Sequence, residues 1–206
     1  MPTTLDLLLA NPLADPLIGK FYPAEPELRQ LLLTHSMCVA QKAIRIAESL
    51  KSCRPDVEPD MLFIARAALL HDIGIANCDA PDIHCHGQLP YICHGVEGAR
   101  MLAEEGLFAY ARVCERHTGS GLTADNIADQ GLPLPQRDML PETLEEKIIC
   151  YADKFFSKNP DSLTSEKSLQ SIRRSMLAHG EDALARFDSL TRQLTCGPEN
   201  PDDSAT

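Results

Sequence analysis

The amino-acid sequence predicts an all-α protein that folds as a single helical domain. Leu and Ala recur at helical spacing in most segments, whereas the alternation of Val and Ile that is typical of strands is missing. The 206 residues, 44% of them apolar, suit one ordinary domain with a real core. We therefore expect this domain over residues 27–195, after an N-terminal helix and proline-rich lead-in over 1–26 and before a disordered tail over 196–206.

The individual helices are predicted from apolar periodicity and from the residues at their ends. Several prolines punctuate the connection after the first helix, and Gly74 suits a left-handed position after the third. Irregular loops are expected over Asn77–Cys93 and Thr118–Pro141, where this periodicity is lost. The predicted helices are Thr4–Ala10, Glu27–Lys51, Pro59–Leu70, Gly95–Glu105, Leu107–His117, Glu142–Lys158, Leu163–Ala178 and Asp182–Leu194.

Charge and hydropathy argue against two classes of partner. The net charge is −11, from 30 acidic and 19 basic residues, so no overall field attracts nucleic acid or anionic lipid. The longest apolar runs, such as Leu7–Ala10, are far shorter than the roughly 20 residues that cross a bilayer. We expect no membrane contact, no nucleic-acid partner and a small-molecule substrate, and self-association into a homo-oligomer stays open.

The cysteines and the first residues bear on the compartment. Eight cysteines are scattered through mostly helix-like segments and lack the dense pattern of a small disulfide scaffold. The chain begins without a basic segment followed by a long apolar stretch, so no secretory signal is visible. A reducing cytoplasm is the expected location.

The first chemical signal is the adjacent pair His71-Asp72, which follows the apolar run Ala67–Leu70 at a predicted helix end. Burying an imidazole and a carboxylate beside so apolar a run is costly unless they are paired or bind a metal. Taken alone, the pair is equally compatible with a helix C-cap and a surface Asp.

His35 and Asp153 add to this signal from two other predicted helices. His35 precedes the apolar face that continues at Val39, and Asp153 is embedded in the apolar segment Ile148–Phe156. Each alone is more often a capped or salt-bridged residue. Three separate helices that each supply a nitrogen or oxygen ligand predict a metal site within a helical bundle.

With these residues the sequence resembles the HD superfamily of metal-dependent phosphohydrolases, in the version whose motif reads His-Asp-Ile-Gly. The matching positions are His35, His71–Gly74 and Asp153, and the resemblance covers residues 30–160. It implies an HD-type helical bundle in which His35, His71, Asp72 and Asp153 hold a metal ion.

Two further histidines match the members of this superfamily that bind two metals. His94 lies at a predicted helix start and His117 at a predicted helix end, where each alone could serve as a capping residue or a favourable cation. The resemblance implies that His94, His117 and a bridging Asp72 hold the second ion. Mixed imidazole and carboxylate ligands suit Fe, Mn, Co or Ni, with Zn less favoured.

Basic residues near these ligands are candidates for substrate contacts. Lys154 follows Asp153, Lys42 lies on the helical face of His35, and Arg116 precedes His117. We expect Asp72, Lys154 and Arg116 to act in catalysis, and Lys42, Arg116, Lys154 and His86 to contact substrate. For each lysine and arginine a solvated surface charge is an equally good interpretation.

A competing metal site is suggested by soft ligands in one short segment. Cys78, His84, Cys85, His86 and Cys93 could bind zinc structurally, but their spacing lacks a paired Cys-x-x-Cys unit.

The leading functional interpretation is hydrolysis of a phosphomonoester or phosphodiester, with nucleotides and cyclic nucleotides among the candidate substrates. Two metals would share a water, lower its pKa and bind the phosphoryl oxygens, so that metal-bound hydroxide replaces a Ser or Cys nucleophile. Alternatives are an HD-type di-iron oxygenase, similar to inositol oxygenase, and a non-catalytic metal-binding sensor.

Overall fold

The computed structural model describes residues 14–22 and 26–197, and it is mainly α-helical, as predicted. The helix predicted at Thr4–Ala10 and residues 198–206 of the predicted tail lie outside the described residues. The α-helices are α2 (Ala14–Phe21), α3 (Pro26–Cys53), α4 (Met61–Leu70), α5 (His94–Glu104), α6 (Phe108–Arg116), α7 (Ala124–Asp129), α8 (Leu144–Asp153), α9 (Leu169–Ala178) and α10 (Glu181–Leu194). Short 3₁₀ helices are η1 (Ile73–Asn77), η2 (Pro81–Ile83), η3 (Tyr91–Cys93) and η4 (Pro160–Ser162).

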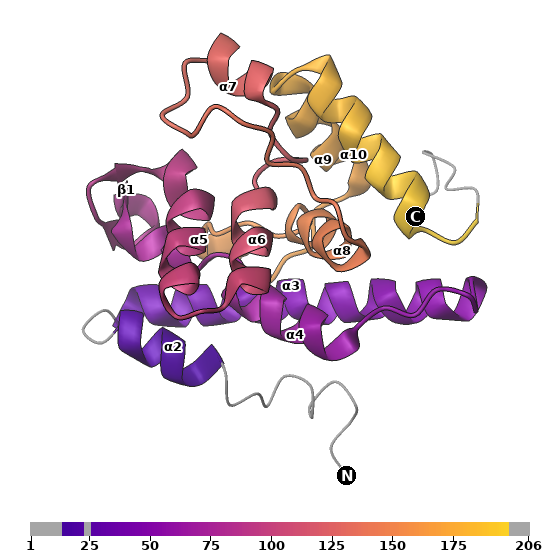
Figure 1. The fold of residues 1–206 in the computed structure, drawn as a ribbon, viewed down its shortest axis with the longest axis horizontal. Coiled ribbons are helices and arrows are strands. Elements are labelled where there is room, and N and C mark those ends of the chain that lie inside the picture. The colour runs from indigo at the N-terminus through magenta and orange to yellow at the C-terminus, as the bar shows by residue number, and fades with distance from the viewer. Residues whose placement is uncertain (1–13, 23–25, 198–206) are drawn as a thin grey trace.

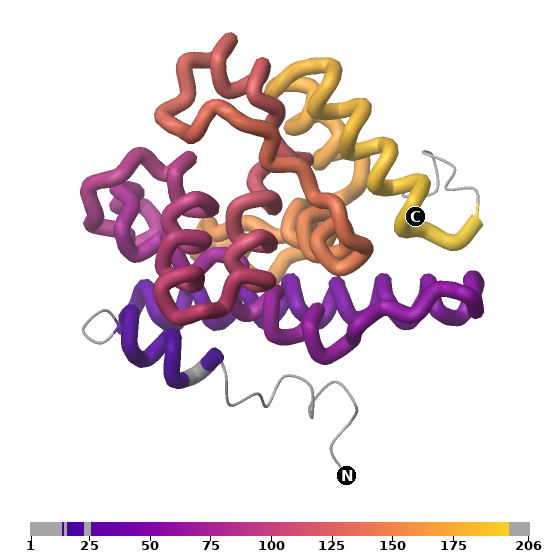
Figure 2. The backbone as a smooth tube through the Cα atoms, in the orientation of Figure 1, coloured from indigo at the N-terminus to yellow at the C-terminus, as the bar shows by residue number. Residues whose placement is uncertain are grey.

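The long helix α3 forms the base on which the other helices are assembled (Figure 1). Helices α2 and α4 lie along one side of α3, while α5, α6 and α8 lie on the other side. Helices α9 and α10 pack against each other and α10 also contacts α8, as the path of the chain in Figure 2 shows. Within the described residues, no helix is long and apolar enough to span a bilayer.

The core forms because apolar side chains recur on one face of each helix. In α3, Val39, Ala43, Ala47 and Leu50 follow one another at intervals of three or four residues and are fully buried. Helix α8 starts with a capping box in which the Thr143 hydroxyl accepts from the Glu146 backbone N–H. Helix α8 packs against α3, α4, α6 and α10, which places it in the centre of the domain.

Helix α2 replaces part of the proline-rich connection that the sequence predicted. Pro16 is tolerated because it lies in the first turn, where a backbone N–H has no helical partner. The helix leads to the buried Tyr22, whose hydroxyl donates to the Ile73 carbonyl at 2.7 Å and accepts from the Ala76 N–H at 3.3 Å. The described residues 14–22 therefore pack against the helices of the predicted domain, and Tyr22 supports η1.

A small sheet occupies the segment for which an irregular loop was predicted. Strand β1 (Cys78–Ala80) pairs antiparallel with β2 (Cys85–His86) and parallel with β3 (Leu89–Pro90), in the order β2-β1-β3. Strands of two or three residues are too short to show the alternation by which a strand is recognised. The sheet joins η1 to the start of α5.

Gly74 has a different role from the left-handed helix end that the sequence suggested. It lies within η1 and is not among the glycines with positive φ. A Cβ atom at this position would overlap the carbonyl oxygen of His94 and the backbone N of Gly98. Gly74 is therefore required for the close approach of η1 to α5.

Two predicted helix boundaries and one predicted loop were wrong in the second half of the chain. Helix α8 ends at Asp153 and not at Lys158, and α9 begins at Leu169 and not at Leu163. The loop 118–141 contains α7, which starts with a capping box at Thr123. The early end of α8 lets the chain turn back toward the centre of the domain.

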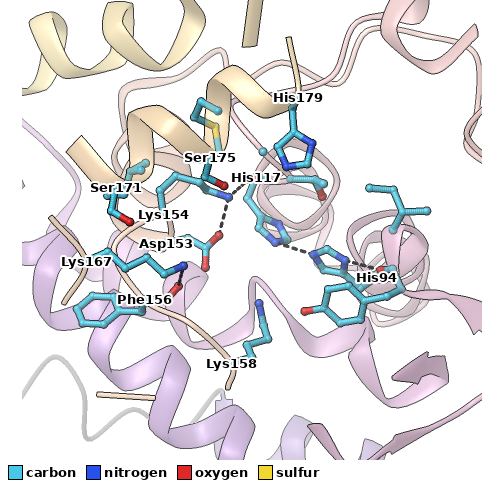
Figure 3. Close-up of a pocket in the computed structure, with 16 residues that line it drawn as sticks. His94, His117, Asp153, Lys154, Phe156, Lys158, Lys167, Ser171, Ser175 and His179 are labelled. Atoms are coloured by element: carbon cyan, nitrogen blue, oxygen red, sulfur yellow. Dashed lines mark hydrogen bonds and ion pairs between the residues drawn. The ribbon is translucent and has the colours of Figure 1, made fainter. Parts of the chain in front are cut away.

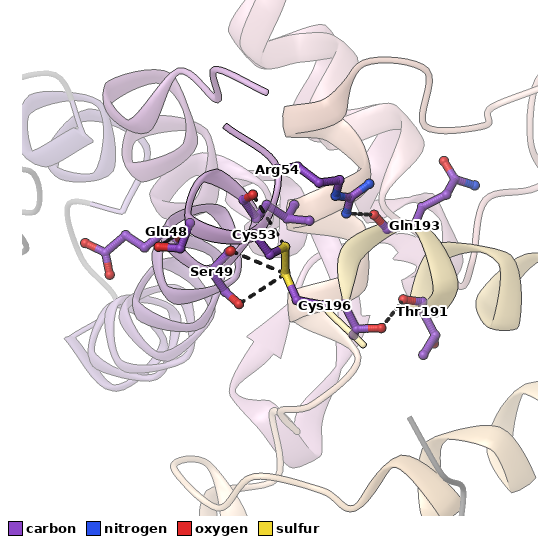
Figure 4. The surroundings of a disulfide bond; sticks show 10 residues. Glu48, Ser49, Cys53, Arg54, Thr191, Gln193 and Cys196 are labelled. Carbon is purple, nitrogen blue, oxygen red and sulfur yellow. Dashed lines mark hydrogen bonds between the residues drawn. A yellow bond between two sulfur atoms is a disulfide. The ribbon is translucent and has the colours of Figure 1, made fainter. Parts of the chain in front are cut away.

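A disulfide joins Cys53, at the end of α3, to Cys196, just beyond α10 (Figure 4). The Cα atoms are 6.2 Å apart and the two cysteines are separated by 143 positions. Next to it, the Arg54 guanidinium donates to the Gln193 carbonyl. The other six cysteines are free thiols. The scattered cysteines thus include one long-range pair, which their spacing did not indicate.

Candidate metal centre

Six buried side chains from six elements converge at the centre of the domain. His35 lies in the middle of α3, and Asp153 is the last residue of α8. His71 caps the C-terminus of α4, and Asp72 lies at the start of η1. The relative exposures are 1% for His35, 0% for His71 and Asp72, 5% for His94, 1% for His117 and 7% for Asp153.

The first group of possible ligands contains His35, His71, Asp72 and Asp153. Nε2 of His35 lies 3.1 Å from Oδ2 of Asp72 and 3.0 Å from Oδ1 of Asp153. Nε2 of His71 lies 3.0 Å and 3.4 Å from the same two oxygens. Two imidazoles and two carboxylates thus direct one atom each toward a common point.

The second group contains Asp72, His94 and His117. Oδ1 of Asp72 lies 3.5 Å from Nε2 of His94 and 3.3 Å from Nε2 of His117. Helix α5 begins at His94, and His117 caps the C-terminus of α6, so these two packed helices place both rings. Asp72 directs Oδ2 at the first group and Oδ1 at the second, as a bridging carboxylate would.

Backbone contacts orient three of the four rings. The Nδ1 atoms of His71, His94 and His117 lie 2.7 Å from the carbonyl oxygens of Ala68, Tyr91 and Cys114, each three residues earlier. A carbonyl only accepts, so Nδ1 carries the proton and donates it. When a ring is neutral, its Nε2 atom therefore presents a lone pair to the centre, which is how histidines are prepared to bind a metal.

The residues present fit a divalent metal. Nε2 of His94 and Nε2 of His117 face each other at 3.1 Å, although both Nδ1 atoms already donate to carbonyls. Two lone pairs in this arrangement repel unless a cation lies beside them. In addition, Nε2 of His71 and both oxygens of Asp72 are buried without a well-aligned hydrogen-bond partner. Nitrogen and oxygen atoms of this kind are ligands that transition metals bind.

The charge states of the centre follow from burial and from neighbouring charges. Burial would raise the pKa of Asp72, but His71 and Lys158 outweigh it and hold this pKa well below its usual value. Burial would lower the pKa of His71, but Asp72 and Asp153 raise it to about 9. Burial lowers the pKa of His94 to about 3, so its ring is neutral near pH 7. The carboxylates are ionised and His94 is ready to act as a ligand.

Lys158 is a residue of this centre that the sequence interpretation missed. Its Nζ lies 2.6 Å from Oδ2 of Asp72 and 5.9 Å from the centre of the Tyr91 ring. Lys158 had been predicted as the end of a helix, where its side chain would point away from Asp153. Pro160 limits this helix only to Asn159 or earlier, so the sequence held no signal for an end at Asp153.

The four residues expected to contact substrate occupy different places. Lys154 lies in the centre: its Nζ contacts Oδ2 of Asp153 at 2.7 Å and donates to the His117 carbonyl at 3.0 Å. Arg116 instead pairs with Glu142 at 2.7 Å and donates to the Leu140 carbonyl.

Lys42 and His86 lie away from this centre. Lys42 pairs with Glu166, lies 3.8 Å from the centre of the Phe155 ring and lines a separate cavity beside Cys196. His86 is exposed on β2 and does not line the cavity over the metal ligands. Tertiary packing therefore brings together all six expected metal ligands and Lys154, and it does not bring Arg116, Lys42 or His86 to that cavity.

The alternative zinc site in the segment 78–93 is not formed. The sulfur atoms of Cys78, Cys85 and Cys93 each donate to a different backbone carbonyl. Among the described residues, the groups with metal-ligand geometry are the two at Asp72.

A cavity of about 600 Å³ opens beside the ligands (Figure 3). His94, His117 and Asp153 form one side, and Ser171, Ser175 and His179 form the other side along α9. Lys154, Lys158 and Lys167 complete its polar lining. The cavity gives an organic ligand access to the centre, and its amines favour an anionic one.

Comparisons with known proteins identify the family. A family model described as HD domain matches residues 32–157. A tRNA (cytidine(56)-2'-O)-methyltransferase of Picrophilus torridus is 32% identical over 175 residues, which are 84% of this chain and 44% of that protein. An uncharacterised protein of Methanocaldococcus jannaschii is 37% identical over 123 residues, which are 59% of this chain and 64% of that protein.

A second tRNA (cytidine(56)-2'-O)-methyltransferase, of Thermoplasma volcanium, is 29% identical over 165 residues, covering 80% of this chain and 42% of that protein. The chain thus spans less than two thirds of the length of each of these relatives. No solved structure matches the chain. The family model covers more than half of the sequence, including the His-Asp pair and the other four residues of the centre. This chain therefore belongs to the HD domain family.

Proposed function

We propose that the protein is a metal-dependent phosphohydrolase that hydrolyses a phosphomonoester or phosphodiester of a small molecule, with nucleotides among the candidate substrates. The observation that carries the proposal is the Asp72 carboxylate, which directs one oxygen to each of two groups of buried ligands. Two divalent ions, drawn from Fe, Mn, Co and Ni, would activate a water and neutralise phosphoryl oxygens there. The HD domain family supports hydrolysis as the type of reaction.

The protein's own residues supply orientation and charge. His71, His94 and His117 are held with Nε2 inward by their carbonyl contacts, so little reorganisation is needed when ligands bind. The ammonium group of Lys154 lies between Asp153 and the His117 carbonyl, at the edge of the cavity. In this position it would offset negative charge that develops on a phosphoryl group.

Arg116 has a structural role in this proposal. Its contacts with Glu142 and with the buried Glu146 support the start of α8, which in turn positions Asp153. Arg116 does not line the cavity and is not among the groups that touch substrate in this proposal.

Phosphoryl hydrolysis is favoured over the oxygenase alternative by the charge of the cavity. Lys154, Lys158 and Lys167 line it in a chain of net charge −11, and Asp153 is the carboxylate among the lining residues. An oxygenase acting on a neutral substrate would not need these amines. The relatives named as methyltransferases match this chain over less than half of their own lengths, so the proposal does not draw on methyl transfer.

The six free cysteines support a cytoplasmic location, because a reducing compartment keeps thiols unpaired. In that compartment Cys53 and Cys196 would be held as thiols, and their disulfide would form under oxidising conditions.

The proposal is tested by metal analysis followed by turnover. The purified protein is analysed for metal by mass spectrometry, stripped, reloaded with Mn²⁺ and screened against phosphomonoesters and phosphodiesters. Asp72→Asn should abolish hydrolysis, and Asp79→Asn, on the exposed face of β1, is the matched control.

A single turnover in ¹⁸O-labelled water should place one labelled oxygen in the released phosphate. A phosphorylated protein residue on the reaction path would contradict direct attack by water. Dependence on O₂ without release of phosphate would assign the protein to the oxygenase alternative, and metal binding without turnover of any ester would favour the sensor.

A further inference from the structure

The cavity beside the metal ligands is larger than the reacting group needs. Its volume is about 600 Å³, within the range of pockets that hold whole organic ligands. His94, His117 and Asp153 occupy only one side of it. The remaining walls therefore face the leaving group of a substrate whose phosphoryl group lies at the metal ligands.

One of the three lining lysines is available to that leaving group. Lys154 and Lys158 are engaged by Asp153 and Asp72. The ammonium group of Lys167 donates to the Phe156 carbonyl at 3.3 Å and pairs with no carboxylate among the described residues. An unpaired ammonium group at a cavity wall is a binding group for an anion.

The surroundings of Lys167 also favour an added negative charge. Burial is the largest cause of a lowered Lys167 pKa; Asp153 opposes it, and Lys154 and Lys158 add repulsion. An anion bound near the three ammonium groups would offset the repulsion between them.

Helix α9 and its C-cap residue contribute polar groups to the same wall. Ser171, Ser175 and His179 follow one another at intervals of four residues and line the cavity opposite the metal ligands (Figure 3). Their neighbours Ile172 and Met176 are buried and attach this face to the domain. Hydroxyl donors beside Lys167 suit the oxygens of a phosphate or carboxylate.

Building on the proposed function, we propose that the cavity selects phosphate esters whose leaving group carries a second anionic group, a phosphate or a carboxylate. Lys167 pairs with this second group, and the hydroxyls of Ser171 and Ser175 donate hydrogen bonds to it. Substrates of this kind are bisphosphates and phosphorylated hydroxy acids.

The test uses two pairs of compounds that differ chiefly by one anionic group. They are glycerol 3-phosphate against 3-phosphoglycerate, and AMP against adenosine 3′,5′-bisphosphate. Each is titrated into the Mn²⁺-loaded full chain by calorimetry, and kcat/KM is measured wherever the ester is turned over. In the wild type we expect the second anion to improve Kd or kcat/KM by about tenfold in at least one pair, as a charge-assisted hydrogen bond would.

Lys167→Gln should reduce that ratio to about one. The matched control is Arg174→Gln, which removes a positive charge from an exposed position of α9 outside the cavity lining and should leave the ratio unchanged. A ratio near one for both pairs in the wild type, or a tenfold ratio that persists in Lys167→Gln, would overturn the inference. This inference and the proposed function can fail separately. If no ester were hydrolysed, calorimetry would still show the tenfold ratio of Kd values in the wild type and its loss in Lys167→Gln.

Discussion

The shared position of Asp72 leads to a specific prediction about metal content. Its Oδ2 contacts the first ligand group and its Oδ1 contacts the second, whereas His117 belongs to the second group alone. Asp72→Asn should therefore deplete both metals, and His117→Ala should deplete one. The comparison of the two variants tests whether the carboxylate is a bridge.

The expected size of the effect follows from burial. Asp72 is fully buried, and the pairs that it forms with His35 and His71 are almost completely shielded from water. Removing one charged partner from such a buried set costs about 3–5 kcal/mol, which corresponds to an affinity roughly 10² to 10⁴ times weaker. Dialysis against a buffered metal concentration near the wild-type Kd will show a change of this size.

Inductively coupled plasma mass spectrometry of the dialysed proteins gives the metal content per chain. Circular dichroism confirms folding, and Asp79→Asn provides a control at an exposed carboxylate. Full metal content in Asp72→Asn together with depletion in His117→Ala would refute the bridging role. Equal and partial depletion in both variants would show that Asp72 serves one ion only.

Three further predictions concern protonation, support of the centre and the disulfide. Because the pKa of His71 is raised to about 9 and a ligand must be deprotonated, metal affinity should rise with pH up to about 9. Calorimetry in two buffers at pH 7 should then detect about one released proton per chain, and none would contradict it. Tyr22→Phe removes the hydroxyl partner of one buried and one partly buried backbone group, so the free energy of unfolding measured in urea should fall by about 1–3 kcal/mol. An unchanged free energy of unfolding would contradict this prediction. Reduction of the Cys53–Cys196 disulfide, or Cys53→Ser, should lower Tm and reduce the free energy of unfolding by at most about 5 kcal/mol for a loop of this length. Cys38→Ser, which replaces a free thiol, should not show this loss.

Much of the fold follows from local patterns that act within one helix. The faces of α3, α8 and α10 are predicted by apolar residues every three or four positions, since burial selects one side of a helix. Helix α2 and the sheet at β1 were missed because they are short and their formation depends on contacts made elsewhere. Tyr22, for example, is anchored by backbone groups more than fifty positions away.

The residue types of the centre were predictable for a different reason. Histidine and aspartate in apolar segments are costly to bury alone, so each of His35, His71 and Asp153 indicates a partner before any fold is known. The adjacent His-Asp pair, with the histidines that follow it, then predicts a set of ligands. Their chemistry is a property of the residues themselves.

Distances and neighbours are a property of the packed domain. Arg116 adjoins His117 in sequence, yet its side chain reaches Glu142, while Lys158 returns to Asp72 from a distance of 86 positions because α8 ends early. Position along the chain does not reveal which way a charged side chain points once its helix is rotated and ended by tertiary contacts. The sequence thus predicted the candidate ligands that the fold brings together, but three-dimensional packing alone selected which lysines face the cavity. Long flexible side chains are placed by the surfaces around them.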